Sequence, residues 1–141
     1  MMRDALYRQV AIGDLVLFSV LAVPVVGAWV LDLLLALNAW LEWSGSLPTS
    51  AGVYLLLHLL GLLGAGLAFL RMRIGARSDA IAATIVVKLA AAALFAIGVV
   101  AGAPAVLLIL GAVDLLQGLA LLFCSMRSAA PPGLENVEST Q

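Results

Sequence analysis

The chain has 141 residues, of which 65% are hydrophobic and 11% are charged, and its formal net charge is −1. A soluble domain is nearer to about half apolar and about a quarter charged, so this composition indicates a membrane protein. The lack of a global positive charge argues against nucleic acid as a partner, and the apolar segments leave no room for a soluble catalytic domain.

Four apolar segments are long enough to be membrane-spanning helices, which need about 20 predominantly apolar residues. We expect an all-α integral membrane protein that folds as a four-helix bundle with antiparallel, up-and-down topology. The membrane domain covers residues 1–127, and residues 128–141 are expected to be disordered because they contain two adjacent prolines and few large apolar side chains. The expected spans are approximately residues 10–37, 53–70, 80–101 and 105–126.

The first expected span, residues 10–37, contains one proline and two aspartates. Pro24 has no backbone N–H, so it should kink the helix near its middle. Asp14 and Asp32 are 18 residues apart, which places them on one helical face and about 27 Å apart along the axis. This spacing favours two aspartates that bracket the bilayer at its two interfaces. The alternative is a polar stripe that functions in transport.

Residues 33–43 carry Trp40 and Trp43, and Tyr54 follows after a loop rich in Ser, Gly and Pro. Tryptophan and tyrosine are enriched at the headgroup level of membranes. Two alternatives stay open for this segment. It extends a long, tilted first span, or that span ends near Asp32 and a short interfacial helix follows.

The second span, residues 53–70, contains the single histidine, His58. It lies about one turn inside the interface near which Asp32 is expected, so a pair of these two side chains is geometrically possible. A hydrogen-bonded packing residue is the commoner role for a histidine in an apolar helix, and a ligand or proton-carrying role is the alternative. We expect no metal site, since no second His or Cys has metal-ligand spacing, and no cofactor.

Lys88 and Asp114 each lie about ten residues inside an apolar span, and a very short turn joins the two spans. A charge at that depth costs roughly 2.5–3.5 kcal/mol on insertion scales, so it is usually paired or functional. Their offsets from the turn place the two side chains within about a turn and a half in depth. We therefore expect an intramembrane ion pair that fixes the register of the helices. A proton or substrate site is the alternative, and Gln117, one turn from Asp114, belongs to the same polar region.

Several glycines lie at spacings that let helix backbones approach closely, which is common in membrane helices. The expected helix-packing positions are Gly61, Gly64, Gly98, Gly102, Gly111 and Gly118. Two of them flank Asp114, so another helix can pack in a groove beside its carboxylate.

The basic residues are sorted between the loops. The arginines that flank the spans are Arg3 and Arg8 before the first, Arg71, Arg73 and Arg77 after the second, and Arg127 after the fourth. The other two loops contain none. By the positive-inside rule both termini, and with them the tail, face the cytoplasm.

The second half of the chain contains the segments LRMRIGARSDAIAATIVVKLAAAALFAIGVVAGAP and AVDLLQGLALLF. In its basic loop, and in an Asp followed by apolar residues and Gly from Asp114 to Gly118, this half resembles small bacterial DoxX-like membrane proteins. The resemblance implies a four-helix architecture and a location in the bacterial inner membrane. Some such proteins are similar to small subunits of quinone-reactive oxidoreductases, which implies an accessory role.

These features favour a structural or accessory membrane protein without catalysis of its own. Its partners would be the lipid bilayer and another membrane protein or a second copy of itself. The first alternative is a small proton-coupled transporter. Its residues would be Lys88, Asp114, Asp14, Asp32 and His58. The second alternative, an enzyme subunit that acts on lipid or quinone, is supported only by His58 with Asp32, and a pocket joining these two residues would favour it.

Overall fold

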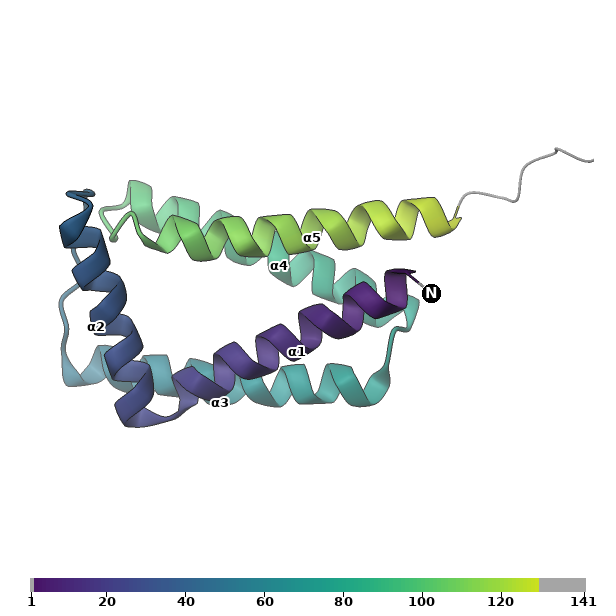
Figure 1. Cartoon of the computed structure of the whole chain (residues 1–141), viewed down its shortest axis with the longest axis horizontal. Coiled ribbons are helices and arrows are strands. Elements are labelled where there is room, and N and C mark those ends of the chain that lie inside the picture. The colour runs from purple at the N-terminus through teal and green to yellow at the C-terminus, as the bar shows by residue number, and fades with distance from the viewer. Residues whose placement is uncertain (1, 130–141) are drawn as a thin grey trace, which may run out of the picture.

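The computed structural model describes residues 2–129, which form five α-helices and no strand. The helices are α1 (Met2–Ala22), α2 (Pro24–Trp40), α3 (Ala51–Ile74), α4 (Ser78–Val100) and α5 (Leu107–Ala129) (Figure 1). Of these, α1, α3, α4 and α5 are long and apolar enough to cross a membrane, whereas α2 is a shorter apolar helix of 17 residues.

The first apolar segment forms two helices, so the single span expected over residues 10–37 is wrong. The polar residues at the start are already helical, α1 ends at Ala22, and α2 begins at Pro24. Val23 between them has extended backbone, with φ −81° and ψ 116°. Proline is well suited to the first position of a helix, where its missing N–H costs no intrahelical hydrogen bond. The expected kink is therefore a complete break. Neither alternative for residues 33–43 holds, because these residues lie in and just after the second half of α2.

The other three long helices lie close to the expected segments. Ser50 precedes α3, and its hydroxyl oxygen accepts a hydrogen bond from the Val53 N–H at 3.4 Å, which is an N-terminal cap. Gly75 ends this helix with φ +76°, a conformation that glycine adopts without strain. The last helix, α5, continues to Ala129, beyond the expected end at Met126. The rest of the tail, for which the sequence predicts disorder, lies outside the described residues.

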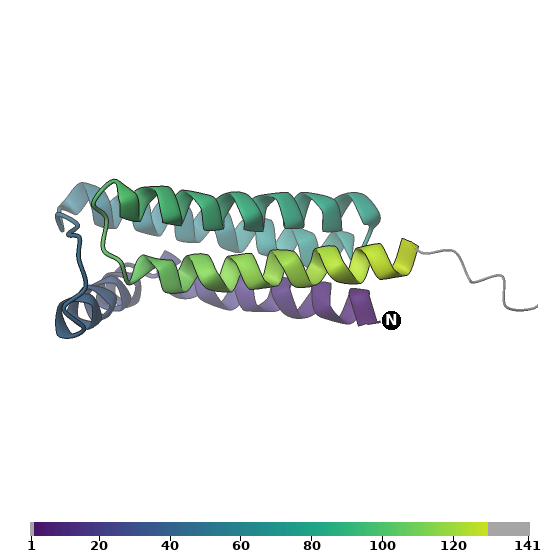
Figure 2. The same cartoon turned by 90° about the horizontal axis from the view of Figure 1, so that it is seen from above.

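The long helices are arranged as two pairs (Figures 1 and 2). α1 packs along α3, and α4 packs along α5. The N-terminus, the α3–α4 connection and the end of α5 lie at one end of the molecule, which we call the arginine end. The arginines of these segments are Arg3, Arg8, Arg71, Arg73, Arg77 and Arg127. At the opposite end, α2 runs across the ends of the long helices, next to the α4–α5 turn.

Large apolar side chains cover the outer faces of the long helices. On α3 these side chains are between 46% and 65% exposed, at Leu55, Leu56, Leu59, Leu60, Leu62 and Leu63. A soluble protein rarely exposes a continuous apolar surface of this kind, whereas a bilayer covers it with acyl chains. The exposed leucines and the four long apolar helices together indicate a membrane protein.

The short helix α2 is fixed at both of its ends. At its start, a Cβ added to Gly27 would lie 3.1 Å from the ring of His58 in α3. Near its end, the buried Asn38 accepts a hydrogen bond from the Val106 N–H at 2.9 Å and donates one to the Trp43 carbonyl at 3.0 Å. Because His58 belongs to one helix pair and Val106 immediately precedes α5, α2 connects the two pairs.

The loop after α2 also contacts the α4–α5 turn. The Ser46 N–H donates to the Gly102 carbonyl at 3.1 Å, and the Ala105 N–H donates to the Ser44 carbonyl at 3.0 Å. Gly45 lies between the two bonding positions of the loop with φ +92°, and a Cβ on it would be 2.1 Å from a carbonyl oxygen of the turn. Only glycine fits there, so this loop holds the far end of the α4–α5 pair.

Glycines on α3 and α5 let neighbouring helices approach closely. A Cβ added to Gly61 would lie 2.4 Å from the backbone nitrogen of Ala22, and one added to Gly64 would lie 2.4 Å from a phenylalanine ring of α1. At Gly111 and Gly118 the nearest side-chain atoms of α4 would be 3.0 Å away. The close packing within both helix pairs therefore depends on positions without a side chain.

Gly98 and Gly102 serve a different purpose from the helix packing that their spacing predicts. The Gly102 N–H donates to the Val99 carbonyl, and the Ala103 N–H donates to the Gly98 carbonyl. This pair of bonds is the Schellman motif, which closes a helix with a glycine at positive φ, here +102°. The two glycines thus end α4, and a Cβ on Gly102 would have no neighbour within 4 Å.

Two glycines of α3 offer a matched test of this packing. A methyl group at Gly61 meets the α1 backbone, whereas one at Gly66 meets nothing within 4 Å. We predict that Gly61→Ala lowers the free energy of unfolding by about 1–3 kcal/mol through overpacking. Gly66→Ala should raise it by up to about 1 kcal/mol, because alanine has the higher helix propensity. Unfolding in mild detergent, followed by circular dichroism, measures both. Equal effects of the two substitutions would contradict the close approach of α1 and α3.

Candidate functional site

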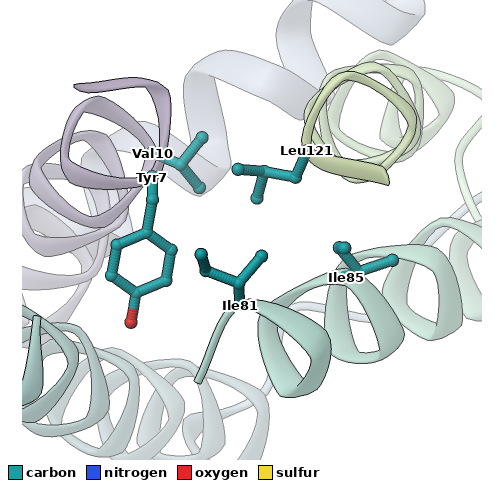
Figure 3. Packing of buried hydrophobic residues seen from close by; sticks show 5 residues of the cluster. All are labelled: Tyr7, Val10, Ile81, Ile85 and Leu121. Carbon is teal, nitrogen blue, oxygen red and sulfur yellow. The ribbon is translucent and has the colours of Figure 1, made fainter. Parts of the chain in front are cut away.

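A cluster of buried apolar side chains joins three of the long helices (Figure 3). Its members are Tyr7 and Val10 of α1, Ile81 and Ile85 of α4, and Leu121 of α5. Their side chains point toward one another, and the Tyr7 hydroxyl donates to the Arg71 carbonyl of α3 at 3.5 Å. The apolar cluster thus brings α1, α4 and α5 together toward the arginine end, and the Tyr7 hydroxyl adds a contact with α3.

Each of the three helices of the cluster carries a charged residue seven positions from one of its apolar members. These pairs are Tyr7 and Asp14, Ile81 and Lys88, and Asp114 and Leu121. Seven residues correspond to about two helical turns, which keeps both side chains on one face and separates them by roughly 10.5 Å. In each helix the charged residue lies farther from the arginine end than its apolar partner does. The apolar cluster therefore brings the three charges to a common depth.

The charged side chains form one connected network. The Lys88 ammonium donates to Asp14 Oδ1 at 2.5 Å and to Asp114 Oδ1 at 2.7 Å. Asp14 Oδ2 accepts from Nη2 of Arg71 at 2.8 Å. Each of the four long helices therefore contributes one member, and the two cations balance the two carboxylates.

The centre of the network is shielded from solvent and its edges are less so. The side chains of Asp14 and Lys88 are 4% and 7% exposed, whereas those of Asp114 and Arg71 are both 19% exposed. A buried ion pair gains little net free energy, but the loss of one partner strands the other charge and is strongly destabilising. Asp14 is the most consequential member, because its loss removes an acceptor from both cations.

The structure places Asp14 and Asp32 differently from the expectation of two aspartates on one helical face. Asp14 lies near the middle of α1 rather than at an interface, and Asp32 lies in α2 because the chain breaks at Val23. The exposed Asp32 accepts a hydrogen bond from the Tyr54 hydroxyl at 2.7 Å. The two aspartates therefore belong to separate sites.

His58 does not pair with Asp32 in the structure. Its Nδ1 lies 2.9 Å from the Leu21 carbonyl oxygen, and because a carbonyl only accepts, this nitrogen carries the hydrogen. Leu21 is in the last turn of α1, where carbonyl groups have no partner within the helix. The histidine thus satisfies a carbonyl at the break between α1 and α2.

Gln117 lies one turn along α5 from Asp114. Its Oε1 atom is buried and has no hydrogen-bond partner among the described residues. Such an unpaired acceptor is uncommon and calls for an explanation. The α5 side of the network thus combines a partly exposed carboxylate with an unsatisfied amide oxygen one turn away.

Arg71 is the network member that sequence reasoning does not identify. The expected second span ends at Leu70, which places this arginine in the loop, whereas α3 continues to Ile74. The seven-residue offset that the other three charges share gives no signal for it either, since α3 contributes no side chain to the apolar cluster.

Among the residues that the structure describes, no group of three or more His, Cys, Asp or Glu side chains is arranged to hold a metal ion. Comparisons of the chain with protein-family models, with curated proteins and with solved structures find no match. The resemblance to DoxX-like proteins therefore stays a prediction, and the geometry of the charge network is the main guide to function.

Asp14 and Asp114 differ in burial and in the number of cations that they bind, so their loss should have different effects on stability. Asp14→Asn should lower the free energy of unfolding by about 3–5 kcal/mol, because it leaves two cations with one carboxylate between them. Asp114→Asn should cost less, since Lys88 keeps its bond to Asp14 and the lost carboxylate is partly exposed. Denaturant titration in mixed micelles measures both changes, with the exposed Asp79→Asn as the control. A larger loss for Asp114→Asn than for Asp14→Asn would contradict this ranking.

Proposed function

We propose that the protein is an accessory or structural membrane protein without catalysis of its own. It is a four-span bundle of antiparallel helices whose apolar outer surface contacts lipid and another membrane protein or a second copy. The observation that carries this proposal is the network, in which one charge from each long helix is paired and the total charge is zero.

A balanced and buried network suits a structural role better than a transport role. A carrier has to release a charge from its partner while a proton or substrate moves. Here Asp14 holds two cations at once and is almost completely buried. Buried polar contacts of this kind are best attested as devices that fix register and assembly, which is what a small scaffold in a membrane requires.

The orientation that this role implies places the arginine end in the cytoplasm, by the positive-inside rule. The end crossed by α2 then faces the other side of the membrane. Trp29 and Trp40 of α2 and Trp43 just after it are exposed, which suits a helix lying at the headgroup level. The resemblance to DoxX-like proteins adds the bacterial inner membrane as the proposed location.

A small proton-coupled carrier is the second candidate. Two observations favour it: the partial exposure of Asp114, and the Oε1 of Gln117 one turn away, which has no partner within residues 2–129. A carboxyl group that takes up a proton becomes a donor, and a nearby amide oxygen can accept from it. His58 and Asp32, the two residues on which the enzyme alternative depends, bond to different partners.

A double-substitution cycle tests the structural role. Lys88→Met and Asp114→Leu should each lower the melting temperature, because each leaves an uncompensated charge in the network. The double variant should recover most of the loss, since the remaining Arg71–Asp14 pair is neutral, with a coupling free energy of about 0.5–3 kcal/mol. Thermal unfolding in mild detergent gives all four values. Strictly additive losses would contradict a structural pair.

Proton flux separates the two candidate functions. Vesicles that contain the protein, a trapped pH-sensitive dye and an imposed potential should take up protons no faster than protein-free vesicles or vesicles with the double variant. Faster uptake by the wild type, lost in Asp114→Asn, would overturn the accessory role in favour of the carrier. The cycle and the flux assay are independent, because a charge can stabilise the fold and also carry a proton.

A further inference from the structure

A groove lies between α3 and α4 on the outer surface, beside the charge network. It has a volume of about 250 Å³, and most of its wall is apolar. Leu67, Leu70 and Val87, which line it, are all more than half exposed, so the groove opens sideways toward the surroundings of the helices. Ala80 and Ala83 of α4 provide its depth, because their side chains are small.

Arg71 is the charged part of this wall. Its guanidinium contacts Asp14 through Nη2, and a guanidinium carries five N–H donors in a fixed plane. The bond to Asp14 holds the arginine in place, so the groove has a positioned cation near its arginine end. Thr84 is not available as a donor there, because its hydroxyl already donates to the Ala80 carbonyl at 2.8 Å.

A second cation, Arg77, belongs to the short connection between α3 and α4, the two helices that form the groove. It immediately precedes α4 and is three positions before Ala80, which lines the groove. Arg77 pairs with Asp79 at 3.3 Å, but both side chains are highly exposed, and such surface pairs contribute little. A phosphate group can therefore compete with Asp79 for this arginine.

We infer that the groove binds an anionic phospholipid, with one acyl chain between α3 and α4 and the phosphate near Arg77 and Arg71. Charge complementarity decides the occupant: basic pockets between membrane helices on the cytoplasmic side bind anionic headgroups. A helix of a second copy would fill an apolar groove, but it would not use the arginines at its end. This inference does not rest on the accessory role and holds equally for a carrier.

Native mass spectrometry of the full chain in mild detergent tests the site. Phosphatidylglycerol should bind more tightly than phosphatidylcholine with the same chains. Arg77→Gln should weaken phosphatidylglycerol binding about fivefold, the usual effect of one basic residue near an anionic membrane surface, and Asp79→Asn should strengthen it by freeing Arg77. Arg127→Gln is the matched control. It removes the same charge at the same end of the molecule, where Arg127 stacks on Phe123 instead, and it should leave binding unchanged.

Substitution of adjacent alanines tests the apolar part of the groove. Ala83→Phe should block it and lower the binding of both lipids, whereas Ala82→Phe, on an exposed position outside the groove wall, should not. Melting temperatures of all variants establish that each one is folded. Equal losses in Arg77→Gln and Arg127→Gln, or lipid binding unaffected by Ala83→Phe, would overturn the inference. So would a dimer that Ala83→Phe abolishes without any change in lipid binding.

Discussion

The bond between Asp14 and Lys88 is the contact on which the arrangement of the long helices depends. Each helix pair carries its own cation and carboxylate: Arg71 with Asp14 in α1–α3, and Lys88 with Asp114 in α4–α5. Each of these two ion pairs is neutral by itself, which lowers the cost of placing it among apolar groups. The Asp14–Lys88 bond then joins two neutral pairs, and it can form only at the depth and register set by the apolar cluster beside it.

The opposite end of the molecule is held in another way. There the helix pairs are connected by α2, which contacts α3 through Gly27 and His58 and contacts the start of α5 through Asn38. Backbone hydrogen bonds between the loop after α2 and the α4–α5 turn add to this connection. One end is thus fixed by charges and apolar packing, and the other by hydrogen bonds to backbone groups that would otherwise lack partners.

The sequence allowed the prediction of features that depend on neighbouring parts of the chain. The pairing of Lys88 with Asp114 can be predicted from the sequence because a short turn fixes the depth of both residues. Asp14 could not be assigned to them, since its partner Lys88 is 74 positions away and a proline can either kink or end a helix. That choice depends on α3, where His58 satisfies the Leu21 carbonyl and Gly61 admits the end of α1. The seven-residue offset between apolar and charged positions is present in the sequence of three helices. Only the fold shows that their apolar side chains form one cluster and their charges one network.

The loss of one carboxylate affects the network differently from the loss of the other. Releasing Asp14 breaks two charge-assisted bonds at the least exposed member of the network, whereas releasing Asp114 breaks one bond at a partly exposed edge. Loss of the Asp114 bond leaves Asp14 bound to both Lys88 and Arg71. The α5 edge of the network combines its more exposed carboxylate with the buried oxygen of Gln117, which has no partner among the residues that the structure describes.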